Sequence, residues 1–324
     1  MLGPVIGGTI IDGLSWRWIF YVNVPVGMAA LVAAWRWLGP DEPRTSKAPI
    51  DGVGIALLSP GLAAFVYGLS EAGNLGFGAT RVVVSIVAGL VLIAAFVVHA
   101  LRARHPLVDV RLFANRTFAA AGGTTFAFVG TLFAAMLLFP LYEQSLRGAS
   151  ALDAGLLLAP QGLATMIAMP LGGKLGDKVG PRVMVLTGLA FAAVGTLAFT
   201  QLGTDTSHAL LALSGIPRGI GMGLAFPSLL GASYRTLTGA DIPRASTTIN
   251  ILQRVGGAVG TAIFAVILQD GLDAGHGAAA FADTFWWVLG LTLLTAIPAA
   301  LLPTGPAPEA TAEGPAGAPE PAAA

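Results

Sequence analysis

Apolar residues gather in nine long runs, separated by short segments that hold most of the charge. The runs cover residues 18–35, 53–69, 82–101, 118–141, 154–171, 183–202, 209–230, 245–268 and 284–302. A helix needs about 20 apolar residues to cross about 30 Å of hydrocarbon. The runs lack the period-two alternation of barrel strands, and only helices or closed barrels satisfy their backbone polar groups in lipid. The pattern predicts an all-α, polytopic membrane protein with nine full transmembrane helices.

The two ends of the chain differ from this pattern. Residues 1–14, "MLGPVIGGTIIDGL", are apolar but too short to span, and they lack the basic region and cleavage site of a signal peptide. We expect them to be the last part of a partial helix that precedes the nine. After Pro303 the chain is a Pro/Ala/Glu tract, which predicts a disordered tail over residues 303–324.

Composition supports the membrane assignment and excludes other classes of protein. Hydrophobic residues make up 55% of the 324 and charged residues 10%, against about 25% charged in soluble domains. The formal net charge is zero, so nothing argues for a nucleic-acid partner. There is no cysteine, which removes disulfides and thiolate metal sites. The expected partner of most of the surface is the lipid bilayer.

The distribution of Lys and Arg over alternate loops predicts the orientation. Twelve of the 17 cations fall in one set of loops and three in the other, while Arg218 and Arg254 lie inside spans. Cytoplasmic loops retain positive charge. The sequence therefore predicts that the segment 172–183 and the C-terminus are cytoplasmic.

Segment 172–183, "GGKLGDKVGPRV", holds three cations, one carboxylate and four glycines in twelve residues. We expect a loop in which Gly176 and Gly180 allow a tight turn and Asp177 precedes the next helix, whose positive dipole end attracts a carboxylate. A charge network that forms when two bundles close would act as a latch. The alternative is an ordinary cation-rich turn, which explains the cations but not the spacing of the whole motif.

Five polar residues inside the spans are candidates for a substrate or proton pathway: Gln161, Arg218, Asn250, Gln253 and Arg254. An arginine near the bilayer centre costs at least about 2.5 kcal/mol, so it should face a cavity or a partner. Each has a structural alternative, which for Arg218 is bonding to backbone carbonyls or snorkelling, and for the Asn250 to Arg254 cluster is a role in helix association. Met166 and Met169, near Gln161, suit a promiscuous pocket but are also common packing residues. Glu143 is expected to be an exposed loop carboxylate, with proton or cation binding as the alternative.

Two glycine patterns indicate an internal repeat. "GPVIGG" includes Gly3, Pro4, Gly7 and Gly8, and "GGAVGT" includes Gly256, Gly257 and Gly260. Both carry glycines four residues apart, a spacing that allows close helix packing in membranes. Transporters built from repeats place such helices at corresponding positions of their two halves.

These motifs together resemble those of a known family. "GPVIGG" followed by "WRWIFYVNVPVG" is similar to the fifth helix and following turn of fourteen-helix drug:proton antiporters of the major facilitator superfamily. The cytoplasmic segment resembles the superfamily pattern G-x-L-x-D-K-x-G-x-R, matched at Gly173, Leu175, Asp177, Lys178, Gly180 and Arg182. The resemblance implies a major facilitator helical bundle, and a gating role for this motif, above all for Asp177 and Arg182.

The resemblance also implies a division of the chain. Residues 1–38 would end an incomplete N-terminal half, 39–117 would form an extra central helix pair with its linkers, and 118–302 would form a complete C-terminal six-helix half. The family's acidic residue on the first helix, its first copy of the loop motif and its fourth-helix arginine have no counterpart here. We expect a misassigned start, a truncated gene or a second polypeptide that supplies the N-terminal half.

Catalytic chemistry finds no support in the sequence. The four histidines are dispersed without metal-ligand spacing, and neither G-x-S-x-G nor a phosphate-binding loop occurs. We expect no enzyme, no metal and no cofactor. The leading hypothesis is a multidrug efflux transporter of the bacterial inner membrane, which exchanges amphipathic or cationic small molecules for protons by alternating access. The alternative is a truncated, non-transporting membrane remnant or scaffold.

Overall fold

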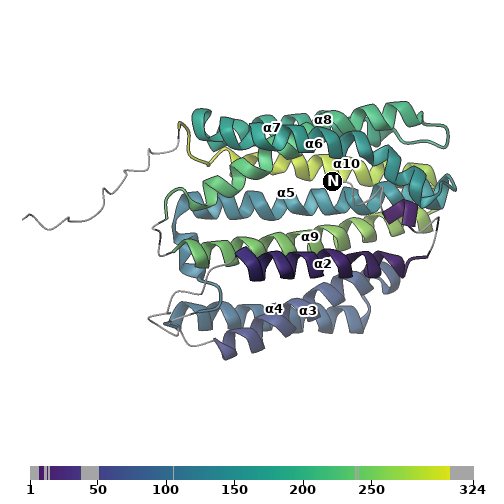
Figure 1. The fold of residues 1–324 in the computed structure, drawn as a ribbon. Helices are drawn as coiled ribbons and strands as arrows, with labels where there is room; N and C mark the ends of the chain where they lie inside the picture. Colours follow the sequence, from purple (N-terminus) through teal and green to yellow (C-terminus); the bar gives the residue numbers. More distant parts are fainter. Residues whose placement is uncertain are drawn as a thin grey trace, which may run out of the picture.

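Long helices form this computed structural model, which describes residues 7–10, 13, 15–37, 51–104, 106–237, 239 and 241–306. They are α2 (Trp18–Trp37), α3 (Gly52–Leu75), α4 (Thr80–Arg102), α5 (Arg116–Leu141), α6 (Ala151–Val179), α7 (Pro181–Leu197), α8 (His208–Tyr234), α9 (Ile242–Asp273) and α10 (Ala278–Leu294). Within the described residues nine helical segments are long and apolar enough to cross a membrane. The prediction of an all-α fold with nine spans is confirmed, and Figure 1 shows the long helices aligned side by side.

The expected partial helix before residue 18 lies largely outside the described residues. Residues 7–10 and 13 are helical, while Gly3 and Pro4 are not described. A side-chain carbon added at Gly8 would lie 2.7 Å from the carbonyl oxygen of Ala151, so Gly8 is in close contact with the start of α6. Gly7 has no such neighbour within 4 Å.

Helix α8 packs closely against both α6 and α7 because glycines lie at the crossings. On the α6 side, a side-chain carbon added at Gly223 would lie 2.6 Å from Cβ of Ala168. On the α7 side, one added at Gly195 would lie 2.6 Å from the backbone nitrogen of Arg218. Backbones that approach this closely gain van der Waals contact, which drives helix association in lipid. The three helices therefore form one packed unit that fixes the position of Arg218.

Helices α5 and α9 cross through a second set of glycines. A side-chain carbon at Gly260 would lie 2.5 Å from both Cα and the carbonyl oxygen of Gly130. One turn earlier, Gly256 faces the backbone of Phe126, and Gly257 faces the ring of Phe133. The glycine pattern of α9 thus joins α9 to α5.

Helix α6 corrects the prediction for segment 172–183. The segment is not a loop along most of its length, because α6 continues to Val179 and α7 begins at Pro181. Gly172 and Gly176 are buried against α8, where the Ser228 hydroxyl donates to the Gly172 carbonyl at 2.9 Å, and this packing maintains the helix. Gly176 is a packing residue and not a turn residue. Gly180 alone makes the turn, with φ of +96°, a conformation that glycine adopts without strain. Asp177 therefore lies in the last turn of α6, at the negative end of its dipole.

Helices α3 and α4 form a pair that packs against α9 at one edge of the bundle (Figure 1). The Asp51 side chain connects α3 and α4 at one end of the pair. Its carboxylate accepts hydrogen bonds from the backbone N–H groups of Gly54 at 2.8 Å and Leu107 at 3.0 Å, and lies 2.8 Å from Nε2 of His99. Burial raises the pKa of the Asp51 carboxyl, but the two backbone bonds and His99 together hold this pKa below its usual value. One side chain thus connects the start of α3, the end of α4 and the segment that follows.

Substituting Asp51 with asparagine is expected to lower the free energy of unfolding by about 1 kcal/mol at pH 7, because neutral hydrogen bonds replace charge-assisted ones. A carboxyl whose pKa is depressed in the folded state contributes stability above its unfolded pKa of 3.8 and loses that contribution as pH falls further. The difference between Asp51→Asn and the native chain should therefore shrink below pH 3.8. Thermal unfolding in maltoside between pH 3 and 8 measures it. A difference that stays constant down to pH 3 would contradict this role of the Asp51 charge.

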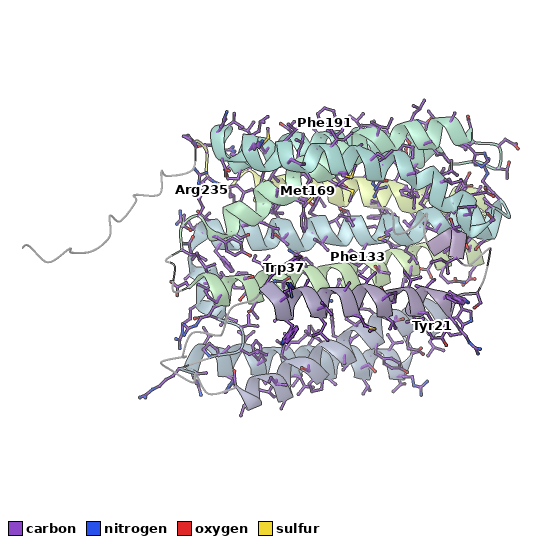
Figure 2. The ribbon with its side chains drawn as sticks, viewed as in Figure 1. Tyr21, Trp37, Phe133, Met169, Phe191 and Arg235 are labelled. Atoms are coloured by element: carbon purple, nitrogen blue, oxygen red, sulfur yellow. The ribbon has the colours of Figure 1, made fainter. Side chains whose placement is uncertain are left out.

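Helix α2 differs from the others in burying none of its residues. Its apolar side chains, such as Leu31 and Val32, are exposed. Tyr21 and Trp37 lie near its two ends (Figure 2), where aromatic side chains favour the membrane interface. In a membrane this surface contacts lipid or another helix.

Candidate functional site

Two adjoining pockets lie among α5, α6, α8 and α9. The first, of about 290 Å³, contains Arg218 and Gln161 and is called here the Arg218 pocket. The second, of about 410 Å³, contains Arg254 and is called the Arg254 pocket. Leu132, Thr165 and Met222 line both, so the two pockets are neighbours along the same helices. Apolar and methionine side chains form most of their walls, as in sites for small organic ligands.

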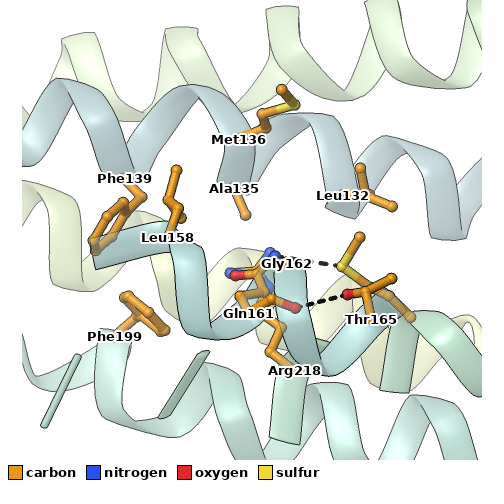
Figure 3. A pocket seen from close by; sticks show the side chains of 11 residues that line it. Leu132, Ala135, Met136, Phe139, Leu158, Gln161, Gly162, Thr165, Phe199 and Arg218 are labelled. Carbon is orange, nitrogen blue, oxygen red and sulfur yellow. Dashed lines mark hydrogen bonds between the residues drawn. The ribbon is translucent and has the colours of Figure 1, made fainter. Parts of the chain in front are cut away.

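The Arg218 pocket contains two of the five polar residues predicted from the sequence. Gln161 donates from Nε2 to the sulfur of Met222 at 3.4 Å, and its backbone carbonyl accepts from the Thr165 hydroxyl at 2.9 Å (Figure 3). Arg218 is only 7% exposed, and its guanidinium carbon lies 5.9 Å from the ring centroid of Phe199. In the described part of the chain this guanidinium has no hydrogen bond or ion pair. The structure therefore places a buried cation at the wall of an apolar pocket.

The Arg254 pocket contains the other three. Asn250, Gln253 and Arg254 line it together, with Met169 from α6. Asn250 also donates to the Ser246 carbonyl at 2.9 Å, one turn earlier on α9. Met166, by contrast, is exposed and lies outside both linings. All five predicted polar residues thus fall on two neighbouring pockets, although they come from three separate helices.

The rims of these pockets are exposed. Met136 at the Arg218 pocket is 57% exposed, and Phe133 and Met169 at the Arg254 pocket are 48% and 43% exposed. Figure 2 shows Phe133 and Met169 on this part of the bundle. In a membrane, these exposed apolar side chains contact lipid, a bound molecule or another helix.

The motif at the end of α6 lines a third pocket of about 280 Å³. Gly173, Asp177 and Arg235 contribute to it, whereas Lys178 is exposed on the last turn of α6. Arg182 lies on α7 after the turn at Gly180, and its backbone N–H donates to the Pro303 carbonyl at 3.4 Å. No ion pair of Asp177 occurs among the residues that the structure describes. Arg235, at the C-terminal end of α8, has a buried Nη1 without a hydrogen-bond partner among the described residues.

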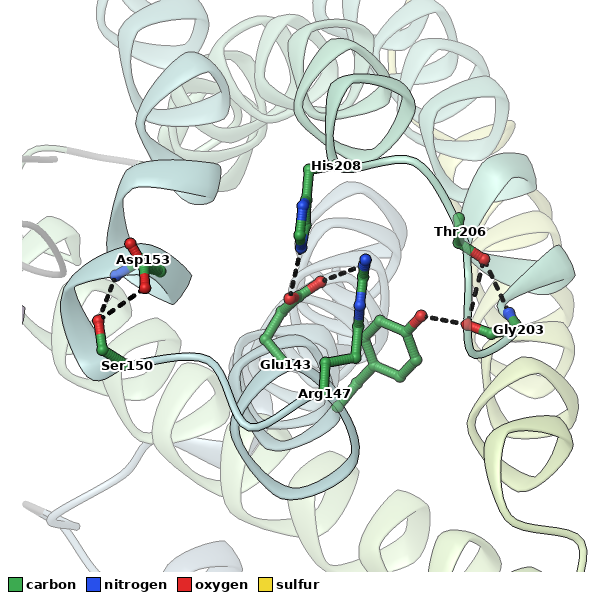
Figure 4. Close-up of polar contacts among 8 residues, drawn as sticks. Glu143, Arg147, Ser150, Asp153, Gly203, Thr206 and His208 are labelled. Carbon is green, nitrogen blue, oxygen red and sulfur yellow. Dashed lines mark hydrogen bonds and ion pairs between the residues drawn. The ribbon is translucent and has the colours of Figure 1, made fainter.

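Glu143 corrects another expectation, because it is fully buried and not an exposed loop carboxylate. It lies in a π-helical turn, Tyr142–Leu146, that continues α5 and directs the side chain into the bundle. Its Oε1 accepts a hydrogen bond from Nη1 of Arg147 at 3.3 Å, and its Oε2 lies 3.4 Å from Nε2 of His208 on α8 (Figure 4). The Tyr142 hydroxyl beside it donates to the Gly203 carbonyl at 2.6 Å. The sequence did not indicate this burial, because the apolar run ends at Leu141 whereas the helix continues past that residue.

The described residues were compared with the ligand groups that metal ions require. In the described ranges no group of three or more His, Asp or Glu side chains is arranged to hold a metal ion. The two pockets together offer apolar walls, three side-chain amides and two arginines, a combination suited to reversible binding of an organic molecule.

Comparison with known proteins gives the family. The profile of the Major Facilitator Superfamily matches residues 1–261 and, in a second alignment, residues 121–324. The "Multidrug resistance protein B homolog" of Mycobacterium tuberculosis is 42% identical over 270 residues, which cover 82% of this chain and 50% of that protein. The "Uncharacterized MFS-type transporter YhcA" of Bacillus subtilis is 32% identical over 266 residues, with 82% and 50% covered. The "Lincomycin resistance protein LmrB" of Listeria monocytogenes is 30% identical over 273 residues, with 84% and 58% covered.

The chain spans about half the length of these curated relatives. The two matches to the family profile together nonetheless cover the whole of this chain. The chain also has the all-helical fold with several spans that was expected from the sequence. The chain belongs to the major facilitator superfamily.

Proposed function

We propose that this protein takes part in multidrug efflux as a secondary transporter, which exports amphipathic small molecules in exchange for protons by alternating access. The observation that carries the proposal is the convergence of Gln161, Arg218, Asn250, Gln253 and Arg254 on two adjoining apolar pockets. The names of the relatives, which describe multidrug and lincomycin resistance, support efflux as the direction of transport. Membership of a transporter family, without a catalytic constellation, supports transport over catalysis.

A second helical bundle completes the transport path in this proposal. The pockets have exposed apolar rims, α2 buries none of its residues, and the relatives are about twice as long as the aligned segment. Either upstream sequence or a separate polypeptide would supply that bundle. We place the protein in a bacterial inner membrane with residue 306 and the following tail on the cytoplasmic side, as the loop charges favour.

The cytoplasmic gate in this proposal is the cluster of Gly173, Asp177, Lys178, Gly180 and Arg182. Asp177 and Arg235 line one pocket without an ion pair between them, and the Arg235 guanidinium has an unsatisfied buried nitrogen. Such a pair of groups is suited to close in one conformation and to separate in another. In this proposal, Asp177 and Arg235 form an ion pair in one state of the transport cycle and separate in the other.

The Asp177→Asn substitution tests this gate. We expect proton-driven dye efflux from a drug-sensitive bacterial strain to fall at least fivefold at equal membrane abundance, because the neutral amide cannot hold a charged latch closed. Lys174→Gln is the matched control, since Lys174 is an exposed charge on the same helix and lies outside the pocket lining. Equal efflux by Asp177→Asn and the native protein would rule out the gating role.

The competing proposal, a non-transporting remnant or scaffold, makes a different prediction for the same assay. The chain as printed is compared with a version extended upstream by about four further spans, at matched abundance. Efflux from the extended version alone supports a transporter that needs its second bundle. Efflux from neither supports the scaffold.

A further inference from the structure

The buried carboxylate of Glu143 has one oxygen that no hydrogen bond satisfies. The side chain is 0% exposed, and Arg147 donates to its Oε1 at 3.3 Å. Its Oε2 has no hydrogen-bond partner in the described part of the chain. Buried acceptors without a donor are costly and therefore uncommon. Nε2 of His208 lies 3.4 Å from this oxygen, so a proton on Nε2 supplies the missing donor.

The end of α5 and the start of α8 hold these side chains together. The Tyr142 hydroxyl donates to the Gly203 carbonyl at 2.6 Å, in the segment that leads into α8. The guanidinium carbon of Arg147 lies 5.8 Å from the centroid of the Tyr142 ring. His208 is the first residue of α8, and Figure 4 shows His208 and Arg147 directed at the Glu143 carboxylate from separate segments. These contacts place the imidazole beside the carboxylate.

Water has access to His208 but not to Glu143. The His208 side chain is 56% exposed and lines a pocket of about 490 Å³ together with Arg147 and Asp153. Histidine is the side chain that gains and loses a proton in the physiological range of pH. In the orientation proposed above, this end of α8 is on the outer side of the membrane. His208 therefore gives the buried carboxylate a route for protons from the outer solution.

The charges of the site balance when a proton is bound. Glu143 and Asp153 are two carboxylates and Arg147 is one guanidinium, so the group is negative by one charge with a neutral His208 and uncharged with an imidazolium. No ion pair of Asp153 occurs in the described residues. The other titratable groups at this end of the neighbouring elements are exposed and form no ion pair with the site in the part of the chain that the structure describes: Asp205, Asp270, Asp273, His276 and Asp283.

We propose that His208 and Glu143 form a proton-binding site of this transporter. A proton from the outer solution adds to the unprotonated ring nitrogen of His208, and the imidazolium pairs through its Nε2–H with Oε2 of Glu143 while Arg147 keeps Oε1. The inference rests on the proposed exchange of substrate for protons and names the residues that bind the proton. Helix α8 begins at His208 and also carries Arg218, so the proton site and the Arg218 pocket share one helix.

The test is a proton titration of the purified full chain in phosphatidylcholine nanodiscs, followed by NMR of nitrogen-labelled histidine rings from pH 5 to 10. His208→Gln assigns the signal. We expect the midpoint of the His208 titration to be at least half a pH unit higher in the native chain than in Glu143→Gln, which is about threefold in proton affinity. His276, exposed between α9 and α10, is the internal reference and should not change. Equal His208 midpoints in the two proteins, or no titration of His208 in this range, would overturn the proposal.

Asp153→Asn gives a second test that does not depend on the folding of Glu143→Gln. Asp153 is exposed, and asparagine can still accept the hydrogen bond from the Ser150 hydroxyl, so the fold should tolerate the change. Loss of this negative charge should lower the His208 midpoint by about 0.3 pH unit, or about twofold in proton affinity. Asp283→Asn, which changes an exposed acid on α10, is the matched control and should leave the midpoint unchanged. Equal midpoints in Asp153→Asn and the native chain would contradict the charge balance on which the proposal rests.

The efflux assay tests whether transport uses the site. Dye efflux from energised cells is measured at outer pH 6 and pH 8 at equal membrane abundance. We expect the ratio of the two rates to be at least twofold smaller in His208→Gln than in His276→Gln, the matched control with the other histidine exposed at this end. Equal ratios in the two variants would overturn the role of His208 in proton exchange.

Failure of this inference is distinguishable from failure of the proposed function. The titration of His208 requires no transport, so it tests the proton site even if no version of the protein exports dye. Dye efflux with an unchanged dependence on outer pH in His208→Gln removes only the proton site.

Discussion

Replacing Gly260 with alanine is expected to destabilise the protein by about 1–3 kcal/mol, and replacing it with leucine is expected to prevent folding. The added carbon would lie 2.5 Å from Cα and the carbonyl oxygen of Gly130, which are backbone atoms and cannot rotate away. Helices α5 and α9 would have to separate along the crossing that also includes Gly256. Fluorescence-detected size exclusion and thermal unfolding in maltoside measure the loss.

The matched control for this prediction is Gly290→Ala. Gly290 is also a mid-helix glycine, on α10, but no atom lies within 4 Å of the position that its added carbon would occupy. Alanine there should leave stability unchanged or raise it by up to about 1 kcal/mol, because alanine favours the helix. If both alanine variants shift the unfolding temperature in the same direction by the same amount, the contact between α5 and α9 is not the cause.

Replacing Arg147 with methionine is expected to lower the free energy of unfolding more than replacing Glu143, the acid with which it pairs, with glutamine. Arg147→Met leaves the Glu143 carboxylate, which is 0% exposed, with Nε2 of His208 at 3.4 Å as its remaining ion-pair partner in the described structure. Breaking a buried pair in this way typically costs about 3–5 kcal/mol. Glu143→Gln removes the buried charge itself and leaves Arg147, which is 15% exposed and also lies over the Tyr142 ring. The Glu143→Gln substitution should lower the free energy of unfolding by about 1–2 kcal/mol, because a charge-assisted hydrogen bond is lost.

A double-mutant cycle measures this asymmetry. The Arg147→Met/Glu143→Gln variant should be more stable than Arg147→Met alone, because the second change removes the unpaired charge. Unfolding by titration with dodecyl sulfate gives the three free energies. Equal losses in the two single variants, or a double variant less stable than Arg147→Met, would show that burial of the Glu143 charge is not the dominant effect.

The spans were predictable because the length and composition of an apolar run depend on the chain alone. The polar residues Arg218 and Arg254 were also visible from the sequence, since a cation inside such a run is costly wherever it lies. Their assignment to neighbouring pockets was not visible, because it depends on how α8 packs between α6 and α7 through glycines such as Gly195 and Gly223.

The errors occurred where helices continue past the apolar runs. Charge and glycine in segment 172–183 favoured a loop, yet contact with Ser228 on α8 keeps the segment helical up to Val179. Glu143 follows an apolar run and was expected in solvent, yet the π-helical turn places it beneath His208. In both cases a tertiary contact outweighs local composition, and no single-sequence pattern contains that contact.

The continuity of α6 has a mechanical consequence. Gln161 at the Arg218 pocket and Asp177 at the charged end lie on the same helix, 16 residues and about 24 Å apart along its axis. A helix transmits displacement as a stiff rod does, whereas a loop would absorb it. A tilt of about 10° pivoting at Gln161 would move Asp177 by about 4 Å, close to the length of an ion pair. In the proposed transport cycle, a small tilt of α6 at the Arg218 pocket would therefore change the contacts of Asp177 at the opposite end of the helix.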